Sequence, residues 1–79
     1  MPTLLNENGY RVFFYSADNL EPMHVHIEHG DGEAKFWLGP VRLASNYRFK
    51  SQELKKARLL VEKKQKFFEE KWNEYFGKK

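Results

Sequence analysis

The chain contains no cysteine, so neither a disulfide nor a thiolate metal site can stabilise it. It also lacks any apolar run close to the ~18 residues that would indicate a membrane-spanning helix. Its first residues, 1–8, do not follow the basic-then-apolar order of a signal peptide. We therefore expect a cytoplasmic protein with no membrane partner. At 79 residues, the chain fits one domain, residues 1–79, stabilised by its own core.

Aromatic residues and basic charge are abundant. Seven Phe, four Tyr and two Trp can bury large areas in a small core. The net charge of +3 is uneven, because residues 51–79 hold nine Lys/Arg against five Asp/Glu (net +4) and residues 1–50 hold five against six (net −1). A basic C-terminal segment can attract nucleic acid, although a solvated helix face of mixed charge gives a similar count.

Alternation of apolar and polar residues predicts an antiparallel β-meander over about residues 10–46. Clusters of Gly, Asp, Asn and Pro mark the turns between its strands. The expected strands are residues 10–16, 23–28 and 33–38, with a short fourth strand near Val41 and Leu43.

The apolar spacing becomes helical from Ser51, which predicts one long C-terminal helix over residues 51–76 with Ser51 as its N-cap. A helix of this length spans ~39 Å, whereas a compact domain of this size is only ~30 Å across. The alternatives are therefore a break near Lys63–Lys66 or a projecting end. A projecting end would expose four aromatic side chains to a partner: Phe68, Trp72, Tyr75 and Phe76.

These elements together predict an α+β fold, in which a meander of three to four strands packs one face against the long helix. All three histidines of the chain lie within residues 24–29. Successive side chains of a strand point to opposite faces, so His24, His26 and Glu28 should share the face away from the helix. Arg11 and Tyr15 should join them from the preceding strand, on a surface that meets solvent.

Three interpretations of the histidines stay open. The first is general acid–base catalysis without a metal or other cofactor, with His24 and His26 transferring protons, Arg11 stabilising phosphorane charge and Tyr15 orienting or donating. The second is a metal site, in which Glu28 or His29 adds a third ligand to the histidine pair. The third is structural, with both histidines hydrogen-bonded to the turn at Ser16–Asn19.

The motif Tyr15-Ser16 followed by Pro22-x-His24-x-His26 resembles a bacterial family catalogued as Domain of Unknown Function 4160. Members typically carry a histidine after the aspartate, where this chain has Asn19, and a second proline, where it has Met23. Further matching segments are residues 1–3, 9–14, 34–38 and 71–73.

The resemblance implies the toxin component of a toxin–antitoxin pair acting on RNA, with an antitoxin-like protein as partner, and other members are labelled transcriptional regulators. We therefore expect an RNA-directed, toxin-type protein whose catalytic candidates are His24, His26, Arg11 and Tyr15. The alternative is a non-enzymatic module that binds protein or nucleic acid through its sheet or its aromatic helix end.

Overall fold

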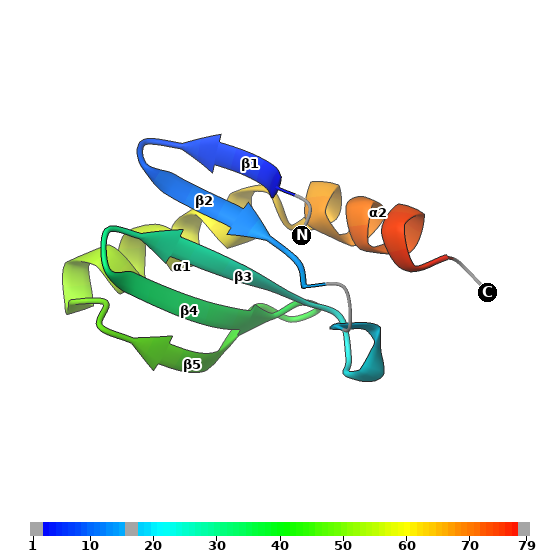
Figure 1. Ribbon diagram of the computed structural model, residues 1–79, viewed down its shortest axis with the longest axis horizontal. Helices are drawn as coiled ribbons and strands as arrows, with labels where there is room; N and C mark the ends of the chain where they lie inside the picture. Colours follow the sequence, from blue (N-terminus) through cyan, green and yellow to red (C-terminus); the bar gives the residue numbers. More distant parts are fainter. Residues whose placement is uncertain (1–2, 16–17, 78–79) are drawn as a thin grey trace.

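The computed structural model describes residues 3–15 and 18–77, apart from the side chain of Asn19. In chain order, the described residues form five strands, a short 3-10 helix and two α-helices (Figure 1). They are β1 (Thr3–Glu7), β2 (Tyr10–Phe13), η1 (Asp18–Leu20), β3 (His24–His29), β4 (Gly32–Trp37), β5 (Arg42–Tyr47), α1 (Ser51–Lys63) and α2 (Gln65–Phe76).

The strands form one antiparallel sheet in the order β1-β2-β3-β4-β5, so β1 and β5 are its edges. The predicted α+β meander is confirmed, but the sheet has five strands rather than three or four. The additional strand is β1, which the sequence analysis missed. Asn8 (φ 54°) and Gly9 (φ 82°) both adopt positive φ between β1 and β2. Asn-Gly suits a two-residue hairpin turn of this kind.

Two strand boundaries differ from the expected ones. β2 ends at Phe13 rather than at residue 16. The fourth predicted strand is a full six-residue strand, β5, rather than a short one. Its end is fixed by Asn46, whose side chain accepts a hydrogen bond from the Phe49 N–H at 3.0 Å and donates one to the Phe49 carbonyl at 3.2 Å. Such local bonds compete with strand pairing and turn the chain toward α1.

The prediction of one continuous helix is wrong, and the alternative of a break near Lys63–Lys66 is confirmed. Lys64 separates α1 from α2 with φ −110° and ψ 19°. Between the fully buried Val61 and Phe68, residues 62–66 are all polar, so no apolar side chain holds the middle of the segment against the core. The N-cap is Lys50 rather than Ser51, and its N–H donates to Glu53 Oε1 at 2.9 Å.

The two helices lie along one face of the sheet, and the core forms between these layers (Figure 1). Phe68 (0% exposed) and Trp72 (8%) are buried in it, so the predicted exposed aromatic end is wrong for these two residues. Phe76 packs partly against the core, and Tyr75 alone of the four is exposed, at 46%. Neither helix is long and apolar enough to cross a membrane.

Candidate functional site

The sheet face away from the helices carries the predicted row of polar and aromatic side chains. In the β2–β3 pairing, Arg11 lies opposite Glu28 and Phe13 opposite His26. In the β3–β4 pairing, His24 lies opposite Trp37. The sharing of one face by His24, His26 and Glu28 is therefore confirmed by the strand register.

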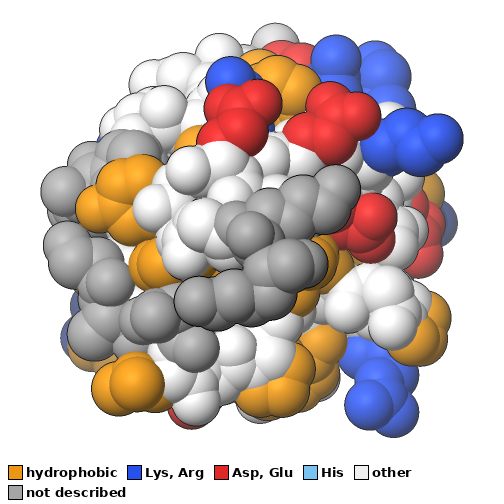
Figure 2. Space-filling model, turned by 90° about the vertical axis from the view of Figure 1, so that its right-hand side faces the viewer, with side chains coloured by type: hydrophobic (Ala, Val, Ile, Leu, Met, Phe, Trp, Pro, Cys, Tyr) orange, Lys and Arg blue, Asp and Glu red, His pale blue; other side chains and the backbone are white. Residues whose placement is uncertain are grey.

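The expectation that this face exposes the histidines to solvent is wrong. His24 is 0% exposed and His26 is 8% exposed. Trp72 of α2 lies 5.2 Å from the His24 ring and Phe13 stacks on His26 at 5.5 Å between centroids. Figure 2 views the end of the molecule where η1 and the end of α2 lie, and no histidine surface is visible among the side chains that it colours. A sheet with helices on one face is here closed on its second face by the β2–β3 connection.

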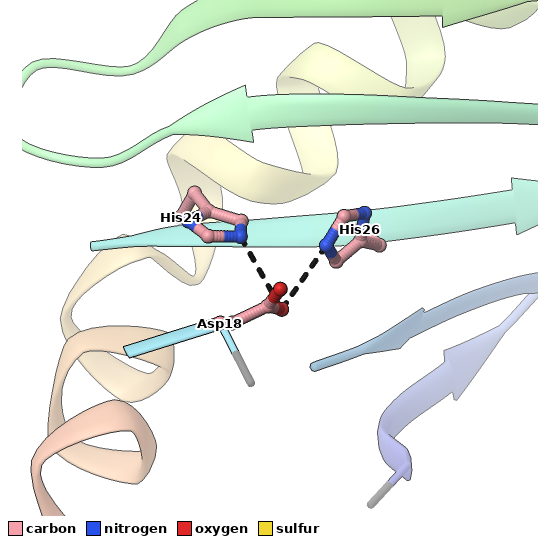
Figure 3. Close-up of side chains that lie close together, drawn as sticks. All are labelled: Asp18, His24 and His26. Atoms are coloured by element: carbon pink, nitrogen blue, oxygen red, sulfur yellow. Dashed lines mark hydrogen bonds and ion pairs between the residues drawn. The ribbon is translucent and has the colours of Figure 1, made fainter. Parts of the chain in front are cut away.

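Asp18, the first residue of η1, brings a carboxylate to the two histidines (Figure 3). Its Oδ2 lies 3.0 Å from Nε2 of His26 and 3.2 Å from Nε2 of His24. The same oxygen accepts a hydrogen bond from the Tyr15 N–H at 2.8 Å, and the Asp18 N–H donates back to the Tyr15 carbonyl at 3.1 Å. This short turn, which aspartate favours, fixes the carboxylate over β3.

The two histidine rings are oriented in the same way. His24 Nδ1 donates to the Pro22 carbonyl at 2.8 Å, because a carbonyl can only accept. His26 Nδ1 lies 3.5 Å from Glu33 Oε2. In both rings, Nε2 therefore points to Asp18, while Nδ1 points to another oxygen.

Burial lowers the pKa of His26, and the nearby Asp18 carboxylate acts in the opposite direction. The Nδ1 of His26 and the Nε2 of His24 are both buried without a hydrogen-bond partner among the described residues. These nitrogens thus lack the access to solvent that proton exchange with an external substrate requires.

Tyr15 is a neighbour of the cluster, as predicted, and it is 39% exposed. Its ring lies 4.5 Å from the His26 ring, and its hydroxyl donates to Glu33 Oε2 at 3.2 Å. Burial raises the pKa of Tyr15, and the Glu33 carboxylate adds to this effect. The tyrosine therefore forms the exposed border of the cluster.

Arg11 and two of the predicted ligands lie elsewhere. Arg11 Nη1 donates to Glu28 Oε2 at 2.8 Å, and its Nε donates to Thr3 Oγ1 at 3.0 Å. Glu28 is therefore occupied by an ion pair. His29 stacks on Tyr10 at 4.0 Å between centroids, and its Nδ1 donates to the Gly9 carbonyl.

Asp18 is the functional candidate that the sequence analysis missed, since we read it only as a turn residue. The structural interpretation did place a bond to residues 16–19, and the contact between His26 and Asp18 confirms that part of it. Ser16 and Ala17 lie outside the described residues. The Asn19 side chain does too, so its departure from the family pattern has no structural outcome.

Asp18, His24 and His26 can together hold a metal ion, because one ligand atom from each lies within 4.8 Å of the others. A comparison with family models matches residues 9–73 to the family described as Domain of unknown function (DUF4160). No curated protein and no solved structure matches the chain. Since the match covers most of the chain and includes the whole Asp18–His24–His26 cluster, the protein belongs to the DUF4160 family.

Proposed function

We propose that the protein binds a divalent transition-metal ion through Asp18, His24 and His26, and that this ion is the centre of its function. The main support is the common direction of the two rings, whose Nε2 atoms lie 3.2 and 3.0 Å from one carboxylate oxygen. Two imidazole nitrogens and one carboxylate are a ligand set that zinc, iron and related divalent ions accept.

His24 provides the sharpest part of the argument. Because its Nδ1 carries the hydrogen bonded to the Pro22 carbonyl, the neutral ring has a lone pair on Nε2. That lone pair points at the Asp18 carboxylate, and the two repel unless a proton or a cation lies between them. The nitrogen is fully buried, so water cannot satisfy it. A metal ion would satisfy both groups.

The distances fit such an ion. Two ligand atoms at about 2.1 Å from a metal are separated by about 3.0 Å at a right angle and about 3.4 Å at the tetrahedral angle. The two distances to Asp18 Oδ2 are 3.0 and 3.2 Å. The ligand atoms therefore have the spacing of a coordination sphere without any rearrangement.

The groups behind the ligands support the same interpretation. A histidine that binds a metal usually donates its other ring N–H to a carbonyl or a carboxylate. Pro22 O occupies this position for His24, and Glu33 Oε2 lies nearest to it for His26. Glu21 Oε1 lies 3.9 Å from His24 Nε2. This local acidity favours a cation over a phosphate group.

Three protein ligands leave a coordination position open, as in catalytic zinc sites. A water molecule on such an ion is a stronger acid than bulk water and can supply hydroxide for hydrolysis. The protein's own part is to hold the two rings and the carboxylate in place. Tyr15, at the exposed border, is placed to contact a substrate.

The proposal is tested by titrating chelator-treated protein with zinc by calorimetry and with cobalt by visible absorption. We expect one ion per chain in both titrations. Asp18→Asn keeps the size of the side chain and removes its charge, so it should weaken binding at least about 100-fold. His29→Gln is the matched control, because this histidine lies outside the cluster, and it should bind as the wild type does.

Absence of binding in the wild type would contradict the proposal, as would an equal loss of affinity in the His29→Gln protein. Circular dichroism of each variant before titration separates lost ligands from lost structure.

A second candidate is toxin-type action on RNA by His24 and His26, with Tyr15 assisting and an antitoxin-like protein as partner. The contact between Tyr15 and His26 favours it, since it joins an exposed hydroxyl to a buried imidazole. Under this candidate, expression of the chain inhibits growth and degrades RNA, and a folded His24→Ala, His26→Ala variant does neither.

The two candidates are distinguished by a chelator. RNA cleavage by purified protein that persists after complete metal removal would favour the metal-independent mechanism. Equal growth inhibition by wild type and by the folded double variant would exclude any role for the histidines in toxicity.

A further inference from the structure

Strand β5 is an edge of the sheet whose outer row of backbone groups faces no other strand among the residues described. Five of its six residues are exposed, including Leu43 at 42% and Tyr47 at 61%. An unpaired, exposed edge of this kind is a template on which another chain can add a strand. Proteins that avoid such pairing usually cover the edge or shorten it, and β5 is as long as the central strand β3.

A groove lies beside this edge, between β5 and α1. It has a volume of about 310 Å³, and apolar side chains at its base come from Phe36, Leu43 and Leu54. Lys55 and Arg58 of α1 line it as well. Because side chains of a strand alternate between faces, a strand added to β5 would place every second side chain over this groove. The groove therefore favours an occupant that is extended and partly apolar.

Charge indicates the remaining chemistry of the occupant. Residues 34–52, which include all of β5, contain four Lys/Arg and no Asp or Glu. Arg58 adds a further cation at the groove, and its Nε is buried without a hydrogen-bond partner among the described residues. Glu62 Oε2 lies 4.0 Å from this nitrogen, too far for a hydrogen bond. A carboxylate in the groove would satisfy it.

We propose that β5 binds an extended, acidic segment of another protein, which pairs with the sheet as a sixth strand. A second copy of the chain is a poorer occupant. Pairing β5 with itself would bring Arg42 and Arg48 of the two copies onto one basic edge, and like charges across a strand pair are destabilising. An acidic segment instead places carboxylates against these cations and its backbone against the free edge.

The test uses a capped eight-residue peptide of alternating valine and glutamate, titrated into the ¹⁵N-labelled full chain. We expect it to shift the amide signals of residues 42–47. A peptide with lysine in place of glutamate tests the charge. A peptide with glutamate and N-methylated valine keeps the charge and removes the N–H donors that strand pairing needs. Both should fail to shift the same signals.

Two charge-reversal variants locate the site. Arg42→Glu with Arg48→Glu should weaken binding of the glutamate peptide at least about tenfold. Lys63→Glu with Lys66→Glu changes the net charge equally, at exposed positions away from β5, and should leave the affinity within about twofold. Because all four residues are exposed or lie on the surface of a helix, both variants should fold.

Several results would overturn the proposal. They are the absence of shifts in residues 42–47 at millimolar peptide, equal binding of the lysine or N-methylated peptide, and equal losses in the two charge variants. A fourth is displacement of the peptide by a ten-nucleotide uridine oligomer that shifts the same signals, because this edge would then be a nucleic-acid surface.

Discussion

The two faces of the sheet bury side chains of different chemistry. Toward the helices, Val25 and Ile27 of β3 are fully buried among apolar neighbours. Toward the other side, His24 and His26 of the same strand are nearly as buried, but their neighbours include a carboxylate from a loop. Apolar burial needs only volume to be filled, whereas buried polar groups need partners in defined directions. The helix face should therefore determine stability, and the histidine face should determine what the protein binds.

The largest expected effect is on the helix face. Phe68→Ala removes a fully buried ring and should lower the free energy of unfolding by about 3–5 kcal/mol, because a cavity forms where the core cannot collapse. Urea denaturation measures this change. Phe67→Ala, at a partly buried neighbouring position, should cost clearly less. Similar losses in the two variants would mean that α2 is not held by its buried face.

The next effect is on the histidine face and depends on the proposed ion. Zinc at 100 times its dissociation constant should raise the free energy of unfolding by about 2.7 kcal/mol, since it binds the folded chain. Thermal unfolding with and without zinc measures this. The Asp18→Asn protein should show little of the gain. An equal gain in that variant would show that zinc stabilises the chain through other groups.

A third effect tests how tightly the helix side is packed. A Cβ added at Gly32 would collide with the ring of Phe49, which follows β5. Gly32→Ala should therefore destabilise the protein by about 1–3 kcal/mol, the usual range for overpacking. Comparison of urea midpoints checks it, and a double-mutant cycle with Phe49→Leu should reveal coupling between the two positions. Additive effects would mean that the ring moves aside freely.

The smallest effect concerns the ion pair between Arg11 and Glu28. Both side chains are partly exposed, so Glu28→Gln should cost only about 0–1 kcal/mol. It should also leave metal affinity unchanged, since Glu28 lies outside the cluster. A large loss of affinity in this variant would extend the site to β2 and narrow the contrast between the faces.

Much of the fold could be predicted because it depends on local patterns. Alternation along residues 23–28 placed Val25 and Ile27 on one face and the two histidines on the other, as the register confirms. Strand β1 was missed because its apolar residues, Leu4 and Leu5, are adjacent rather than alternating. The break at Lys64 depends on how α2 packs at the end of the sheet, which apolar spacing alone does not encode.

The candidate site could be predicted only in part for a similar reason. Spacing within one strand showed that His24 and His26 are neighbours, since both belong to β3. Asp18 reaches them from a separate turn, and no periodicity links that turn to β3. Burial was also misjudged, because the cover comes from the β2–β3 connection and from Trp72, which is 48 positions beyond His24 in the chain.

The position of His24 between Trp37 and Trp72 gives the site an optical reporter. These are the two tryptophans of the chain, and their rings lie 5.5 and 5.2 Å from the imidazole. The intrinsic fluorescence of the whole protein therefore originates beside the histidine cluster. A charge that arrives at Nε2 of His24 lies close enough to both indoles to change their emission. Occupancy of the cluster can thus be followed in the unlabelled protein, at concentrations well below those that calorimetry requires.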